Sequence, residues 1–185
     1  MTARYRLDPT HGQFTVQAFA AGMLSFLGHN PTFAVRDFQG EVRLDPATAA
    51  DAWLRVVVRA DSLQLVDKVS DGDRRQIEDT MRGETLETAA YPEIAFESTE
   101  IAVGPPSGDN RPVRVAGRMS LHGVTRPAQF DAVLTPYTDG VRLAGEFLLK
   151  QSDYRLRPVV ALGGTLRLKD PLRVVFNVVG WKGDG

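Results

Sequence analysis

The sequence predicts an all-β protein with one surface helix, folded as an antiparallel eight-stranded β-barrel. Apolar and polar residues alternate along several stretches of the chain, which is typical of strands that bury one face. Turn residues such as Gly, Pro, Asn and Asp separate these stretches at short intervals, and one stretch has helical periodicity instead. Short strands at regular spacing favour a closed barrel or a sandwich, and closure removes exposed sheet edges.

Length and composition indicate an ordinary globular protein. The 185 residues fit a single domain, residues 1–185, with 43% hydrophobic and 24% charged residues. The net charge of -1 provides no overall field that would attract nucleic acid or an anionic membrane, and no run of Lys or Arg exceeds two residues. The chain has no Cys, which excludes disulfides, thiolate catalysis and Cys-based metal sites.

The first three strands are predicted at residues 13–20, 32–45 and 52–60, where apolar residues recur at alternate positions. The first two are separated by residues 21–31, a loop that contains Gly, Asn and Pro yet is unusually apolar. Two interpretations stay open for this loop. It either folds over one end of the core or forms an apolar lid at a ligand entrance.

Residues 73–87 are the predicted helix. Asp73 and Gln76 fit a capping box at its start. Ile77 and Met81 lie one turn apart and define a narrow buried stripe. The opposite face is charged and is interpreted as a solvated face.

A long hairpin follows a fourth strand at residues 93–103. On either side of His122-Gly123, apolar residues again alternate with polar ones, which predicts two antiparallel strands joined by a tight turn. The last two strands are predicted at residues 140–150 and 171–181. The intervening residues 151–170 follow neither period, and no element is assigned to them.

The interior of an eight-stranded barrel is wide enough either to be filled by side chains or to hold one slender ligand. Several inward positions carry modest side chains, which favours a cavity along the axis: Ala18, Val56, Val58, Val115, Gly117, Ala132 and Gly145. A barrel with a filled interior, serving a structural or partner-binding role, remains the alternative.

Few residues suggest catalysis. The three histidines, His11, His29 and His122, have no spacing typical of a metal site. The chain has neither a Gly-x-Ser-x-Gly motif nor a phosphate-binding Gly-rich loop. We therefore expect no catalytic residues, no metal and no cofactor. One rival hypothesis is an enzyme that acts on a small apolar molecule through His29 or His122.

Four blocks of sequence, in order along the chain, resemble the YceI-like family of polyisoprenoid-binding, lipocalin-like barrels. The blocks are Phe38-x-Gly-x-Val-x-Leu-Asp45, Tyr91-Pro-x-Ile-x-Phe-x-Ser98, Gly117-x-Met-x-Leu-His-Gly-Val-Thr-Arg-Pro127 and Leu149-x-Gln-Ser-Asp-Tyr154. The resemblance implies a long apolar channel that holds an isoprenoid chain, such as a polyprenyl chain or the tail of an isoprenoid quinone. It also implies a binding or transport protein without catalysis, and family members often form homodimers.

Location is a separate expectation. Many relatives are exported and periplasmic, whereas the start of this sequence has no apolar signal segment, so we expect a cytoplasmic protein. No stretch approaches the roughly 20 apolar residues that span a bilayer, so we expect no membrane insertion.

The residues expected to bind the ligand fall into two groups. The mouth of the channel is predicted at Met23, Phe26 and Leu27, with His29 near a polar head group. The wall is predicted from the inward strand positions: Phe14, Val16, Leu54, Val56, Val58, Ile94, Phe96, Val115, Met119, Phe130, Phe147, Val174 and Phe176.

Overall fold

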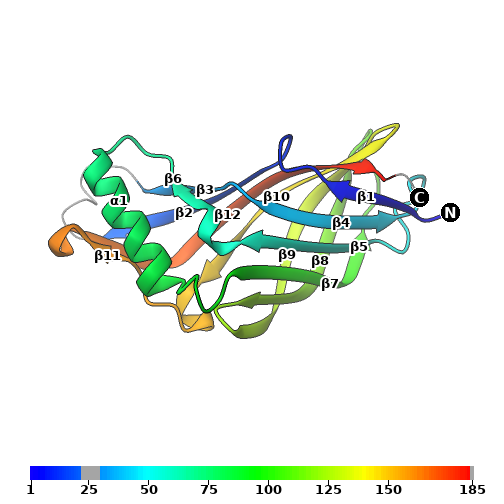
Figure 1. The fold of residues 1–185 in the computed structure, drawn as a ribbon. Helices are drawn as coiled ribbons and strands as arrows, with labels where there is room; N and C mark the ends of the chain where they lie inside the picture. The colour runs from blue at the N-terminus through cyan, green and yellow to red at the C-terminus, as the bar shows by residue number, and fades with distance from the viewer. Residues whose placement is uncertain (22–29, 184–185) are drawn as a thin grey trace.

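The computed structural model describes residues 1–21 and 30–183, which form one antiparallel β-barrel (Figure 1). The closed circuit runs β1-β4-β5-β7-β8-β9-β10-β12, and β12 returns to pair with β1. The predicted eight-stranded antiparallel barrel is therefore confirmed. Its strands are β1 (Ala3–Leu7), β2 (Gln13–Ala21), β3 (Thr32–Val35), β4 (Phe38–Leu44), β5 (Trp53–Arg59), β6 (Leu63–Leu65), β7 (Glu93–Val103), β8 (Arg111–Leu121), β9 (Val124–Pro136), β10 (Gly140–Lys150), β11 (Val160–Ala161) and β12 (Leu166–Lys182).

Three of the barrel's strands are interrupted and β11 lies outside the barrel circuit, which is why twelve strands make an eight-stranded barrel. Short breaks separate β1 from β2, β3 from β4, and β5 from β6. One half of each interrupted strand, namely β2, β3 and β6, pairs in the order β12-β2-β3-β6 and extends the wall at one end of the barrel. This end carries helix α1 (Asp71–Thr80), whereas both chain termini lie at the opposite end (Figure 1).

Helix α1 begins with a different cap from the one predicted. Ser70 is the N-cap residue, and its Oγ accepts a hydrogen bond from the backbone N–H of Asp73 at 3.1 Å. The predicted capping box that starts at Asp73 is therefore wrong by one turn. The apolar stripe is confirmed, because Ile77 and Met81 are buried. Past Thr80 the chain continues in a π-helical turn, Met81–Thr85.

The charged face of the helix is only partly solvated, since it binds the free edge of β6. Glu78 Oε1 accepts the backbone N–H of Leu65 at 2.9 Å, and Arg82 Nη2 donates to the carbonyl of Leu63 at 3.1 Å. Arg74 donates to the carbonyl of Leu65 and, at 2.8 Å, to that of Asp67. A strand at a sheet edge leaves such backbone groups unpaired. The side chains of α1 therefore take the place of a neighbouring strand, and the interpretation as a solvated face is corrected.

The long hairpin is confirmed in register. Strands β8 and β9 pair from Leu121 and Val124 outward, and the turn residues His122 and Gly123 have φ values of 51° and 71°. Left-handed backbone at both turn positions matches the right-handed twist of the flanking strands.

Two of the small inward residues, Gly117 and Gly145, do not leave the open space that was predicted for them. A Cβ atom at Gly117 would lie 2.6 Å from the ring of Phe96, and one at Gly145 would lie 2.8 Å from the ring of Phe176. Phenylalanine rings from adjoining strands thus cover both glycines. The argument from residue size is wrong at these positions, because neighbouring side chains lean into the gaps.

Residues 151–170, unassigned from sequence, are anchored by a 3-10 turn, η4 (Gln151–Tyr154). The buried Gln151 side chain donates from Nε2 to the carbonyls of Lys169 and Asp170 at 2.8 and 3.1 Å. The carboxylate of Asp170 accepts both the N–H and the hydroxyl of Ser152 at 2.7 Å. These bonds fix the start of the segment that leads to β11.

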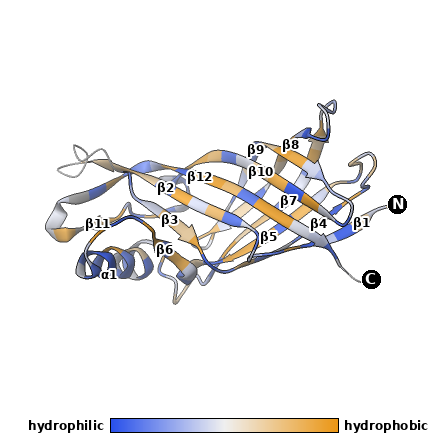
Figure 2. Cartoon of the chain, turned by 90° about the horizontal axis from the view of Figure 1, so that it is seen from above, coloured by the Kyte–Doolittle hydropathy of each residue, from blue (hydrophilic) through white to orange (hydrophobic). Residues whose placement is uncertain are grey.

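Polarity follows the pleat of the strands. Figure 2 shows hydrophobic and hydrophilic residues alternating along the strands, while α1 is mainly hydrophilic. The helices in the described part of the chain include none with the length and hydrophobicity needed to cross a membrane.

Candidate ligand cavity

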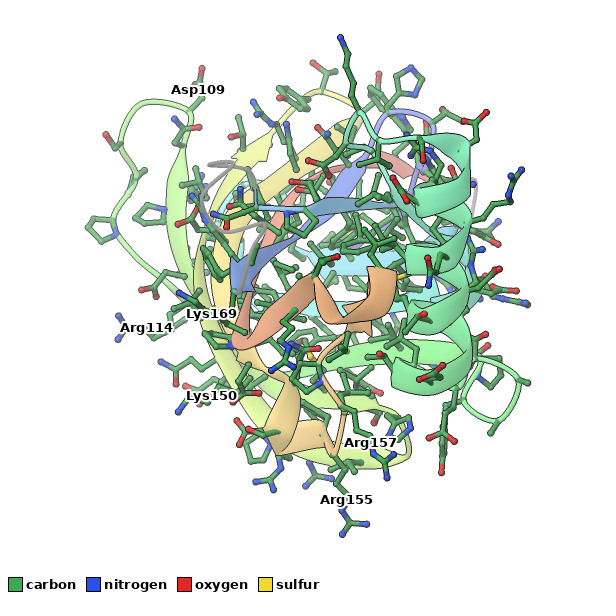
Figure 3. All side chains as sticks on the ribbon, turned by 90° about the vertical axis from the view of Figure 1, so that its left-hand side faces the viewer. Asp109, Arg114, Lys150, Arg155, Arg157 and Lys169 are labelled. Atoms are coloured by element: carbon green, nitrogen blue, oxygen red, sulfur yellow. The ribbon has the colours of Figure 1, made fainter. Side chains whose placement is uncertain are left out.

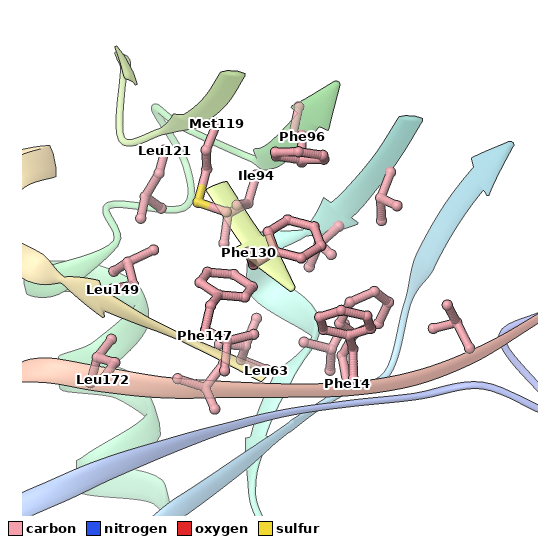
Figure 4. Close-up of a pocket in the computed structure, with 18 of the residues that line it drawn as sticks. Phe14, Leu63, Ile94, Phe96, Met119, Leu121, Phe130, Phe147, Leu149 and Leu172 are labelled. Atoms are coloured by element: carbon pink, nitrogen blue, oxygen red, sulfur yellow. The ribbon is translucent and has the colours of Figure 1, made fainter. Parts of the chain in front are cut away.

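A cavity of about 150 Å³ lies inside the barrel. Figure 4 shows side chains from several strands converging on it. Apolar residues alone line it: Phe14, Val16, Val35, Leu54, Val56, Val58, Leu63, Leu86, Ile94, Ala95, Phe96, Met119, Leu121, Phe130, Leu143, Phe147, Leu149, Leu156, Leu172, Val174, Phe176 and Val178. Such a lining offers no hydrogen bond to water, so the space favours an apolar occupant.

Most of the predicted wall residues line this cavity, as period-two alternation requires. They are Phe14, Val16, Leu54, Val56, Val58, Ile94, Phe96, Met119, Phe130, Phe147, Val174 and Phe176. Val115 does not belong to the lining. It is fully buried beside Ile101 and Phe130, in a packed part of the core. The predicted mouth residues Met23, Phe26, Leu27 and His29 lie outside the described residues.

The prediction missed lining residues from short or irregular segments. Leu63 belongs to the three-residue strand β6, Leu86 follows the π-helical turn, and Leu156 follows η4. None of these segments is long enough to reveal a period. Leu149 and Leu172 alternate in phase with the predicted wall residues Phe147 and Val174. Strand periodicity is therefore the sequence signal that identifies them as lining residues.

Five phenylalanine rings fill part of the interior. Phe130 lies at the centre, with its ring centroid 5.2 Å from those of Phe96 and Phe147 and 5.4 Å from that of Phe176. Phe14 extends the group, 6.0 Å from Phe176. These spacings are typical of favourable aromatic pairs. All five rings belong to the cavity lining, so the aromatic cluster fills the part of the interior next to the cavity.

Several inward side chains remain only half buried although they belong to the core. Val16 and Val174 are paired across β2 and β12, and Phe147 pairs with Val174 across β10 and β12. All three line the cavity. Their residual exposure is consistent with surface that faces the cavity, where an occupant would make contact.

The volume defines what the closed barrel can hold. A cavity of about 150 Å³ is comparable to one that takes up benzene. One five-carbon isoprene unit is of that size. The cavity volume thus corresponds to about one isoprene unit, and a chain of several units needs more space than this volume.

A polar groove of about 570 Å³ lies at the end of the barrel that carries α1. His122 and Glu87 are among the residues that line it. The Nε2 atom of His122 lies 2.5 Å from Oε2 of Glu87, and its ring packs 4.4 Å from that of Tyr91. This pair lies outside the lining of the apolar cavity. Within residues 1–21 and 30–183, no three His, Cys, Asp or Glu side chains converge as a metal site requires.

The model of the family described as "YceI-like domain" matches residues 5–179 of this chain. A UPF0312 protein from Yersinia pestis (strain Pestoides F) is 28% identical over 137 residues, which cover 73% of this chain and 63% of that protein. A UPF0312 protein from Enterobacter sp. (strain 638) is 27% identical over 135 residues, 72% of this chain and 62% of that protein. The chain thus matches less than two thirds of the length of these curated relatives.

Two solved structures share the fold. BcnA from Burkholderia cenocepacia has a TM-score of 0.73 at 17% identity, covering 94% of this chain and 98% of that chain. A polyisoprenoid binding domain from Saccharophagus degradans, implicated in plant cell wall breakdown, has a TM-score of 0.72 at 17% identity, covering 99% and 100%. At this identity the likeness concerns the architecture of the barrel.

Proposed function

The chain belongs to the YceI-like family, and we propose that it is a binding and carrier protein for an isoprenoid-type lipid. The apolar chain of the lipid, from a polyprenyl compound or an isoprenoid quinone, occupies the barrel cavity and leaves unaltered. The similarity in fold to a polyisoprenoid binding domain supports this choice of ligand class.

The observation that carries the proposal is the wholly apolar lining of the cavity. A cavity that orients a polar metabolite places a few hydrogen-bonding groups on its wall. Here the lining residues are aliphatic, aromatic or Met. Such a wall recognises hydrocarbon by shape and cannot distinguish polar substituents.

The expected affinity is modest. Burial of apolar groups contributes about 0.8 kcal/mol per methylene, so one isoprene unit contributes about 4 kcal/mol before ordering costs. At about 0.3 kcal/mol per non-hydrogen atom, a fifteen-carbon prenol gains about 5 kcal/mol, which corresponds to a Kd of about 0.1–1 mM. Longer chains bind more tightly only if the aromatic cluster opens.

Catalysis is not part of the proposal. The described histidines bind carboxylates outside the cavity: His122 binds Glu87, and His11 Nδ1 lies 2.6 Å from Asp8 Oδ2. A general base must reach the reacting group within hydrogen-bonding distance. No described histidine lines the apolar cavity, so the proposed lipid has no base beside its chain.

The test is native mass spectrometry of the full chain, purified without detergent and then incubated with farnesol or geranylgeraniol. We expect a bound species with one prenol per protein. Val174→Phe fills the cavity from a half-buried inward position and abolishes this species. Val133→Phe makes the same change on an exposed position of β9 and leaves binding unchanged. Absence of any prenol-bound species, or equal binding by both variants, contradicts the proposal.

A further inference from the structure

The end of the barrel that carries α1 also bears a basic surface, defined here as Lys150, Arg155, Arg157 and Lys169. All four residues are exposed. Figure 3, which looks onto this end, shows them on its lower half. The four charges have no salt-bridge partner among the described residues.

Acidic residues near the basic surface are mostly engaged. Asp170 accepts two hydrogen bonds from Ser152, and Glu146 is paired with Arg173. Asp153 is exposed and subtracts one charge. Arg155 and Arg157 also line the polar groove together with Glu84 and Glu87, and Glu87 is paired with His122. The basic surface thus keeps a local excess of positive charge in a chain whose net charge is -1.

Two exposed apolar side chains, Leu148 and Val160, lie close in sequence to these basic residues. Leu148 is 70% exposed on the outer face of β10, two residues from Lys150, and Val160 of β11 is 52% exposed. Exposed aliphatic groups beside Lys and Arg are typical of surfaces that rest on a lipid interface, where the charges meet head groups and the apolar groups enter the acyl boundary.

The basic surface lies directly outside the cavity. Leu149 lines the cavity between the exposed Leu148 and Lys150, and Leu156 lines it between the exposed Arg155 and Arg157. A single layer of backbone therefore separates the lipid cavity from the basic surface.

The backbone pairing between β9 and β10 also stops near the basic surface. Strands β9 and β10 pair between Val141–Gly145 and Ala132–Pro136, and this register ends at Ala132 and Gly145. Beyond that point the wall is completed by the rings of Phe130 and Phe147, and by a 2.5 Å hydrogen bond from Arg126 Nε to the carbonyl of Asp153. No backbone pairing between β9 and β10 is present beyond this point.

We propose that this end of the barrel docks on an anionic lipid bilayer, with the basic surface against the phosphate head groups, and exchanges its isoprenoid ligand there. The inference rests on the proposed lipid-binding function and adds the place of exchange. Each Lys or Arg held near an anionic bilayer favours binding by about 1 kcal/mol, which corresponds to about fivefold in the partition coefficient. Four such residues suffice for reversible attachment at low ionic strength, and salt weakens it.

The test is co-sedimentation of the full chain with vesicles of phosphatidylcholine containing phosphatidylglycerol, and with vesicles of phosphatidylcholine alone. We expect binding to the anionic vesicles, and release on raising the salt concentration. The double variant Arg155→Gln/Arg157→Gln lowers the partition coefficient about 25-fold. The matched control, Arg6→Gln/Lys182→Gln, removes two exposed charges from the end that holds the termini, and its binding is unchanged.

Equal loss in both double variants, equal binding to both kinds of vesicle, or no binding to either kind overturns the docking proposal. An acidic protein partner for the basic surface is then the remaining explanation of its charge. Prenol binding in solution, measured on the same variants, separates this outcome from failure of the proposed function. If Arg155→Gln/Arg157→Gln binds prenol and not anionic vesicles, while Arg6→Gln/Lys182→Gln binds both, docking is supported. If the unmodified chain binds vesicles and never binds prenol, the proposed function fails and exchange fails with it.

Discussion

The rings of Phe130 and Phe147 stack where the backbone pairing between β9 and β10 stops, with centroids 5.2 Å apart and an angle of 19° between their planes. The last backbone pair joins Ala132 to Gly145, so Phe130 and Phe147 lie opposite each other two positions beyond it in the same register. Aromatic packing therefore continues the wall in place of hydrogen bonds. Because both rings also line the cavity, the same contact limits the size of the ligand.

Truncation of Phe147 is expected to lengthen the cavity. Phe147→Ala costs about 3 kcal/mol in the free energy of unfolding, at the low end for Phe→Ala because the ring is only half buried. Its affinity for geranylgeraniol rises relative to that for farnesol, as measured by competition with a fluorescent prenol. Leu148→Ala, on the exposed neighbour, changes neither quantity. An unchanged preference in Phe147→Ala shows that this ring does not limit chain length.

Helix α1 is expected to depend on its bonds to β6. Glu78→Ala leaves the backbone N–H of Leu65 without its acceptor and costs about 1–3 kcal/mol. Hydrogen exchange at Leu65 becomes faster, and urea unfolding shows the loss of stability. Asp79→Ala, on the exposed neighbouring position, stays within about 0.5 kcal/mol of the unmodified chain. Equal effects of the two substitutions would mean that the helix packs by its apolar stripe alone.

Gly117 is expected to tolerate no side chain. A Cβ atom there would lie 2.3 Å from the carbonyl oxygen of Glu97, which belongs to the sheet backbone and cannot move aside. Gly117→Ala therefore lowers the free energy of unfolding by about 3 kcal/mol or more. Gly72→Ala meets no atom nearer than 3.9 Å and raises stability by about 0.5 kcal/mol. Thermal unfolding of the two variants distinguishes close packing from a general effect of removing glycine.

The anchor of η4 is expected to weaken in acid. Hydrogen bonds from the hydroxyl and the N–H of Ser152 hold the pKa of the Asp170 carboxyl below its usual value. A carboxyl with a depressed pKa in the folded state contributes stability above its unfolded pKa, about 3.9, and loses that contribution as pH falls through the folded pKa. Asp170→Asn thus costs about 1 kcal/mol at neutral pH. In urea unfolding, the difference from the unmodified chain shrinks as the pH drops below about 4.

The control for this prediction is Asp153→Asn, on an exposed carboxylate of the same turn. At neutral pH its free energy of unfolding is expected to stay within about 0.5 kcal/mol of that of the unmodified chain. A constant difference between Asp170→Asn and the unmodified chain across the acid range would show that the Ser152 bonds act through geometry and not through charge.

Strand positions could be predicted because burial of one face imposes a period of two on the sequence. The period placed residues 93–103 and 140–150 in strands whose bounds agree with β7 and β10. The same period selected most of the cavity lining. It could not locate β1, where Tyr5 and Leu7 alternate with Arg4 and Arg6 over only five residues.

Features that depend on pairing between distant segments could not be predicted. The sequence reveals that Glu78 and Arg82 are charged, yet it carries no sign that β6 lies beside them with a free edge. Likewise, Gly117 and Gly145 suggest empty space until the rings of Phe96 and Phe176 are placed on the adjoining strands. The basic surface could not be predicted either, because its four residues are scattered along the sequence between Lys150 and Lys169 and come together only in the fold.

The most direct test of the account is to locate a bound prenol by NMR. In the full chain with labelled methyl groups, intermolecular nuclear Overhauser effects from geranylgeraniol are expected at Val16, Leu121, Leu149 and Val174, which line the cavity. Effects confined to exterior methyl groups such as those of Val133 and Leu148, with none at the cavity residues, would contradict the claim that the barrel interior holds the isoprenoid chain.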